Sequence, residues 1–194
     1  MRLEMLLTTL AALLATALNP PPSPAPPPPP TPVATTWPVG ARAGERPAVV
    51  RAWDPPSTAY GAGHRGVDLS APPGSPVLAV APGRVSFAGR VAGRGVVSVE
   101  LDGSGDPPLR TTYEPVRATL KKGTRVSAGE QVGTLEAPTG HCPEAPGIPD
   151  DPEACLHWGL RRAGTYLDPL TLLPPWLLRP GPSRLLPLTA PPTP

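Results

Sequence analysis

The sequence has few aromatic residues and no extended basic segment, and both shortages limit what the protein can bind. Among its 194 residues there is one phenylalanine, and aromatic side chains make up 4% of the chain. The net charge is +2, and no run of basic residues is longer than two. Because nucleic-acid-binding surfaces combine a basic stripe with interleaved aromatic residues, this composition argues against nucleic acid as a partner.

Helical patterns and long apolar runs are also scarce. After the N-terminal region no segment is apolar enough to span a bilayer. No stretch shows helical periodicity, and residues 170–178 are expected to form at most a single turn. The length fits one domain. We therefore expect one domain built mainly from strands.

Proline, by contrast, is abundant, with 35 residues in the chain, and unevenly spread, with Pro-rich blocks at 20–38 and 174–194. Proline runs favour the extended polyproline helix and cannot build a core. Residues 5–18 form a Leu/Ala/Thr run with small residues suited to cleavage after Ala17, as in a signal peptide. We predict a signal peptide (1–18), a Pro-rich linker (19–38), a β domain (39–178) and a Pro-rich tail (179–194).

The N-terminal signal predicts that the domain lies outside the cytoplasm, with no membrane span after cleavage; the alternative is a short membrane anchor that stays uncleaved. The chain has only two cysteines, Cys142 and Cys155. In an exported protein such a pair predicts a disulfide that closes the Pro- and Gly-rich loop between them.

Short alternating segments broken by glycine predict the strands, at about 77–80, 84–88, 96–101, 109–113, 122–126, 129–135 and 155–160. This pattern favours an antiparallel β-sheet sandwich. In the last segment, period-two alternation places Leu156 and Trp158 on the core face and His157 on the opposite face.

Two histidines and one carboxylate form the candidate metal set. His64 and Asp68 are four residues apart in a Gly-rich turn, and the apolar neighbours of Asp68 imply that it faces away from the core. His157 adds a third ligand from a face predicted independently. Two His and one carboxylate, with a position left for water, is the arrangement of catalytic Zn²⁺ sites.

Several motifs then match one family in order. Residues 64–77 resemble the H-x-G-x-D-[LI]-x-A-x-x-G-x-P-V signature of lysostaphin-type zinc metallopeptidases, which cut cell-wall peptides. The resemblance covers about residues 60–173. Further motifs of that family are matched by residues 81–85, 112–115, 123–133, 156–160 and 168–170. It implies a β-sheet fold with a groove, zinc ligands at His64, Asp68 and His157, a location at the cell wall, and peptidoglycan peptides as partners.

The resemblance also shows two departures. The family's proton-handling histidines correspond here to Pro115 and Cys155, so the chain resembles a divergent member that lacks them. His141, next to Cys142, is a candidate replacement, or else a loop histidine in solvent. Glu114 is expected to point away from the site, and Cys155 has an alternative as a thiolate ligand that would make the site structural.

Three functions follow as hypotheses. The first is a zinc endopeptidase of weak or absent activity at peptidoglycan. The second is a catalytically silent relative that binds zinc or wall peptides and regulates a cell-wall hydrolase. The third, suggested by the similarity of residues 129–133 to hairpins of lipoyl and biotinyl domains, is a carrier domain; predicted export argues against it.

Overall fold

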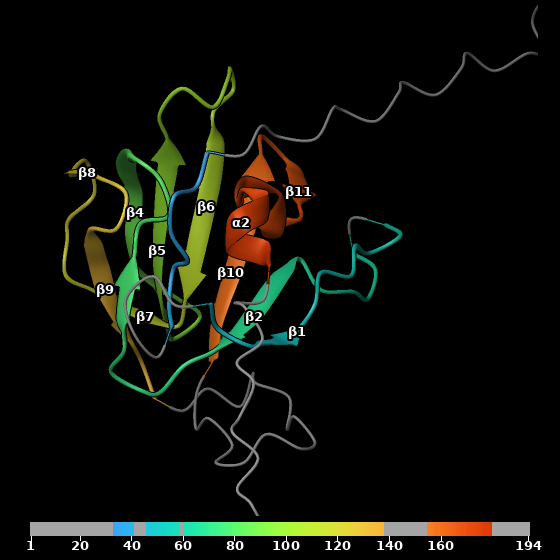
Figure 1. Cartoon of the computed structure of the whole chain (residues 1–194), viewed down its shortest axis with the longest axis horizontal. Helices are drawn as coiled ribbons and strands as arrows, with labels where there is room; N and C mark the ends of the chain where they lie inside the picture. The colour runs from blue at the N-terminus through green and yellow to red at the C-terminus, as the bar shows by residue number, and fades with distance from the viewer. Residues whose placement is uncertain (1–32, 41–45, 59, 138–154, 180–194) are drawn as a thin grey trace, which may run out of the picture.

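Two antiparallel sheets form most of the structure, a computed structural model that describes residues 33–40, 46–58, 60–137 and 155–179. The larger sheet has eight strands (Figure 1). In spatial order they are β1 (Val49–Arg51), β2 (Gly66–Ser70), β10 (Cys155–Arg162), β6 (Leu109–Glu114), β5 (Arg94–Leu101), β4 (Gly83–Val91) and β8 (Arg125–Val126), with β11 (Thr165–Leu167) also paired to β10. The smaller sheet contains β3 (Pro76–Leu78), β9 (Gln131–Leu135) and β7 (Val116–Ala118), in that order.

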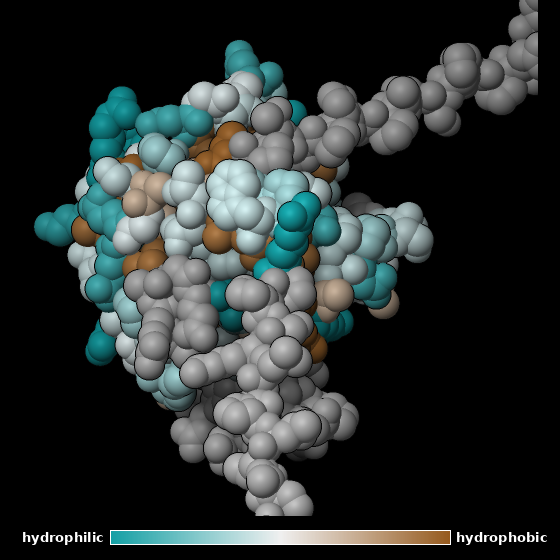
Figure 2. Space-filling view, in the orientation of Figure 1, coloured by the Kyte–Doolittle hydropathy of each residue, from teal (hydrophilic) through white to brown (hydrophobic). Residues whose placement is uncertain are grey.

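The core lies between these sheets. It is built from the inward-facing side chains, which alternate with outward-facing ones along a strand. Strand β10 shows the pattern, because Leu156, Trp158 and Leu160 are buried while His157 is only partly buried. The small sheet contributes Val77 and Val132 to the same core. The predicted antiparallel β-sheet fold and the predicted faces of β10 are thus confirmed. On the face seen in Figure 2, hydrophobic residues show only in small separate areas.

Buried polar groups on β6 help to fix its orientation. The hydroxyl of Tyr113 accepts a hydrogen bond from the backbone N–H of Val80 at 3.3 Å. Burial raises the pKa of this phenol to about 12. The indole N–H of Trp158 donates to the hydroxyl of Thr111 at 2.7 Å. Because these partners need the odd-numbered side chains of β6 in the core, the even-numbered ones face the opposite side.

The segment 33–40 belongs to the folded unit, although the sequence analysis places the domain boundary at residue 39. Trp37 is 1% exposed and packs edge-on against Trp158 at 6.4 Å between ring centroids. The backbone N–H of Ala34 donates to the carbonyl of Leu172 at 2.9 Å. This segment therefore joins the C-terminal turns η1 (Pro169–Leu172) and α2 (Pro175–Leu178) to the core.

Neither of these turns, nor any other described helix, has the length and apolar character of a membrane span.

The sequence explains where η1 begins, because Asp168 caps it by accepting the N–H of Leu170 at 2.9 Å and Pro169 follows the cap. The predicted signal peptide, and most of the linker and tail, lie outside the described residues.

Candidate metal centre

A row of polar side chains crosses three neighbouring strands on the face away from the core. The register pairs His157 of β10 with Asp68 of β2 on one side and with Glu114 of β6 on the other. Directly paired residues share a face of the sheet, with Cβ atoms about 4.5–5.5 Å apart. The row Asp68–His157–Glu114 is therefore fixed by strand pairing.

His64 joins this row from the turn that precedes β2. A backbone bridge to Asp54 holds the turn, with the His64 N–H 2.6 Å from the Asp54 carbonyl. The Nδ1 of His64 lies 2.7 Å from the carbonyl oxygen of Ala52. Since a carbonyl oxygen only accepts, Nδ1 carries the hydrogen and the lone pair of Nε2 is directed at the row. Such an outer hydrogen bond is what orients a metal-binding imidazole.

Three ligand atoms converge at one point. His64 Nε2 lies 3.0 Å from Asp68 Oδ1 and 3.1 Å from His157 Nδ1, and the last two atoms are 2.8 Å apart. Ligands at about 2.0–2.1 Å from a tetrahedral zinc ion are separated by about 3.3 Å. The set thus fits zinc after each side chain moves outward by a few tenths of an ångström, and the predicted ligands are brought together.

Burial gives the set a closed side and an open side. Asp68 is fully buried and His64 is 3% exposed, while the His157 side chain is 13% exposed. A buried carboxylate is costly unless a positive charge or hydrogen bonds offset it, so a divalent cation suits this position. Of the three side chains in this described part of the chain, His157 is the most exposed to solvent.

Gly66 makes room for the His157 ring. A Cβ atom at Gly66 would lie 2.7 Å from both Cε1 and Nε2 of that ring, and 2.5 Å from the carbonyl oxygen of Trp158. Real Cβ atoms essentially never approach other atoms so closely. The glycine in the first motif is therefore required by the close approach of the ring to β2.

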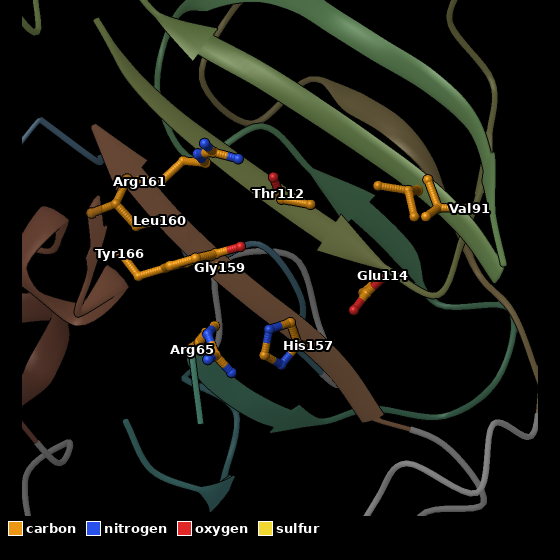
Figure 3. A pocket seen from close by; sticks show the side chains of 10 residues that line it. Arg65, Val91, Thr112, Glu114, His157, Gly159, Leu160, Arg161 and Tyr166 are labelled. Atoms are coloured by element: carbon orange, nitrogen blue, oxygen red, sulfur yellow. The ribbon is translucent and has the colours of Figure 1, made fainter. Parts of the chain in front are cut away.

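A pocket of about 340 Å³ opens beside His157 (Figure 3), within the size range of small-ligand clefts, roughly 300–1,000 Å³. Its floor is formed by the outer face of β6 and β10, and Tyr166 of β11 and Arg65 line one side. The lining residues are Arg65, Val91, Val96, Thr112, Glu114, His157, Gly159, Leu160, Arg161 and Tyr166. In Figure 3 the His157 ring lies between Arg65 and Glu114.

Glu114 faces this pocket, and the expectation that it points away was wrong. That expectation assumed that residue 115, the motif position of a family histidine, faces the groove. Instead Tyr113 and Pro115 are buried, while Glu114 shares the His157 face. An ion pair with Arg94, at 3.9 Å, compensates part of its charge.

His141 and Cys142 lie outside the described residues, so the replacement role and the disulfide remain predictions. Cys155 is buried at the start of β10, opposite Ser70 of β2.

Four features of the site were not predicted from the sequence. Arg161 could have been found, because it shares the parity of His157 on β10. Arg65 precedes β2 by one residue, and Tyr166 depends on the β10–β11 pairing. No sequence pattern indicates that the Ala52 carbonyl orients His64.

Comparison with known proteins gives consistent results. The model of peptidase family M23 matches residues 62–169. The chain is 43% identical to the uncharacterized protein Rv2891 of Mycobacterium tuberculosis, over 74% of this chain and 53% of that protein. It is 30% identical to the uncharacterized lipoprotein YgeR of Escherichia coli, over 73% and 51% respectively. The chain thus spans about half the length of these curated relatives.

Solved structures show the same fold. Helicobacter pylori Csd3 superposes with a TM-score of 0.50 and 25% identity, covering 80% of this chain and 37% of Csd3. The catalytic domain of the antimicrobial peptidase lysostaphin from Staphylococcus simulans also gives 0.50, with 23% identity, over 69% of this chain and 93% of that domain. A zinc containing peptidase from Vibrio cholerae gives 0.50 with 20% identity, over 73% and 41%.

Proposed function

The chain belongs to peptidase family M23, and on that basis we propose that it is an exported zinc-binding protein that acts on peptides of bacterial peptidoglycan, with weak hydrolytic activity. The observation that carries the proposal is the convergence of His64, Asp68 and His157 within 2.8–3.1 Å at the edge of an open pocket. The predicted signal peptide supports export.

The residues divide between holding the metal and admitting the substrate. His64 Nε2, Asp68 Oδ1 and His157 Nδ1 would hold zinc, and the Ala52 carbonyl keeps His64 in the required tautomer. Zinc bound at such a site activates water and polarises a peptide carbonyl. The partly exposed His157 leaves one side of the set open to a peptide lying in the pocket.

We expect weak activity because the proton-handling histidines of the family are missing. General acid–base catalysis contributes about 10²–10⁴-fold to a rate, and Pro115 and Cys155 replace both family histidines. Glu114 is the one carboxylate among the pocket-lining residues, and it stands directly across from His157. It is thus the group best placed to accept a proton from an attacking water.

The same substitutions support a second candidate, a silent relative that binds wall peptides and regulates a cell-wall hydrolase. Both side chains at the substituted positions are buried and neither is an imidazole. The pocket and the ligand set do not depend on them, so binding would survive the loss of turnover.

Metal content is the first test. We expect about one equivalent of zinc in the purified protein, with loss of the metal in the His157→Ala variant. A folded protein that holds no zinc at neutral pH after incubation with the ion contradicts the proposal.

Turnover is the second test, and it separates the two candidates. Zinc-loaded protein is incubated with purified peptidoglycan, and new amino termini are counted. Release above a His64→Ala control supports the weak peptidase. Release equal to that control, with zinc bound, supports the silent regulator.

A further inference from the structure

The end of the pocket away from Glu114 is built from an aromatic ring and two arginines. The guanidinium carbon of Arg65 lies 5.8 Å from the ring centroid of Tyr166, and that of Arg161 lies 5.6 Å from it. Figure 3 shows Tyr166 between the two arginines, with its hydroxyl directed into the pocket. Cation–π contacts of this length hold the charged side chains in place.

The positive charge of Arg161 is not offset by a neighbouring carboxylate among the described residues. Across the sheet, Arg161 pairs with Arg110, and the charge of Arg110 is engaged by Glu100 at 3.0 Å. Among the hydrogen bonds of the described residues, Arg161 donates one, from its Nε to the Ala163 carbonyl at 2.8 Å. Its terminal nitrogens thus form a fork that suits a planar carboxylate.

The position of Arg161 relates this fork to the metal ligands. Arg161 lies four residues beyond His157 on the same face of β10, which is about 13 Å along the strand. Gly159, between them, has no side chain, so the floor is open from the ligands to the fork. An extended peptide of roughly four residues covers that distance.

The two ends of the pocket carry charges of opposite sign. Glu114 stands at the end next to His157 and repels an anionic group there, although Arg94 screens it in part. Arg65 and Arg161 stand at the other end. This charge distribution favours a peptide whose carboxylate lies at the Tyr166 end.

We infer that Arg161, with Tyr166 and Arg65, forms a subsite for a free carboxylate of the peptide, a few residues from the bond placed at the metal ligands. The inference deepens the proposed function and rests on it for the assignment to a wall peptide. It predicts that wall peptides with free carboxylates are preferred over peptides in which these groups are amides.

The test is a binding measurement with a matched pair of ligands. The probes are the synthetic peptide Ala–γ-D-Glu–Lys–D-Ala with free carboxylates and the same peptide with both carboxylates amidated. Binding to the full chain is measured calorimetrically at low salt, with and without added zinc. We expect the free acid to bind about 10-fold more tightly than the amide in both conditions, since one of its two carboxylates forms a charge-assisted pair at the fork.

Two variants assign the effect to the fork. Arg161→Gln is expected to weaken binding of the free acid about 10-fold and to leave the amide unchanged. Arg110→Gln is the matched control, because it removes an arginine from the same row of the sheet and should keep the preference. Thermal unfolding of both variants verifies that they are folded.

Several results would overturn the inference. These are equal binding of acid and amide by the unmodified protein, no binding of either, a preference that needs zinc, or a preference retained in Arg161→Gln. The proposed function is tested by separate experiments, which measure zinc content and the release of new amino termini. A protein without turnover that still prefers the acid through Arg161 retains the subsite.

Discussion

Replacing Gly66 with alanine would separate the geometry of the ligand set from the presence of its ligands. The added Cβ would lie 2.7 Å from Cε1 and Nε2 of His157, against 3.4–4 Å for ordinary contact. The ring must therefore move by about 1 Å, whereas metal–ligand distances tolerate about 0.2 Å. We expect zinc affinity to fall about 10- to 100-fold, the loss that follows removal of a residue that orients a metal ligand.

The substitution also strains the sheet, so a control for stability is required. The same Cβ would lie 2.5 Å from the carbonyl oxygen of Trp158, and such overpacking costs about 1–3 kcal/mol. Gly133→Ala makes comparable clashes on β9, 2.4 Å from Val116 Cγ1 and 2.6 Å from the carbonyl of Arg117. We expect it to lower stability to a similar degree without changing zinc affinity.

Two measurements on each variant decide the outcome. Urea unfolding of the metal-free proteins gives the stability loss, and competition with a chromophoric chelator gives the zinc affinity. If folded Gly66→Ala binds zinc within about twofold of the unmodified protein, the argument from the His157 ring fails. Equal loss of affinity in Gly133→Ala would attribute the effect to general destabilisation.

Three further predictions concern the core and the pocket. Because burial raises the pKa of Tyr113 to about 12, stability should fall by roughly 1 kcal/mol per unit between about pH 10 and 12, and urea unfolding of Tyr113→Phe should show a shallower decline. Trp37→Ala should cost about 3–5 kcal/mol by urea unfolding; a cost below about 1 would place residues 33–40 outside the cooperative unit. Glu114→Gln should lower release of amino termini at least about 10-fold with zinc content unchanged, and an unchanged rate would exclude it as the proton acceptor.

Two of the three candidate ligands, Asp68 and His157, were predictable because the strands around them carry local information. Period-two alternation around Leu156 and Trp158 fixes the face of His157 without knowledge of its neighbours. The apolar residues on either side of Asp68 do the same for β2. His64, whose position in a turn has no period of its own, was proposed from its spacing to Asp68, and the family motif then supported it.

The rest of the site depends on strand pairing, which a single sequence does not show. The face of Glu114 follows from its register with His157 and from the burial of Tyr113. Tyr166 reaches the pocket only because β11 folds back on β10. Trp37 illustrates a different limit, since a proline-rich composition indicates a linker while the neighbouring tryptophan packs in the core.

In the proposed function, metal binding, peptide binding and turnover are assigned to different residues of this site. The candidate ligands are placed by β2, β10 and the turn at His64, and the proposed carboxylate subsite at Arg161 lies four residues along β10 from His157. Neither depends on the positions of Pro115 and Cys155. A weak peptidase and a silent relative would therefore bind the same metal and the same peptide. Comparing the rate of the unmodified protein with that of Glu114→Gln distinguishes them, because only the peptidase needs that carboxylate.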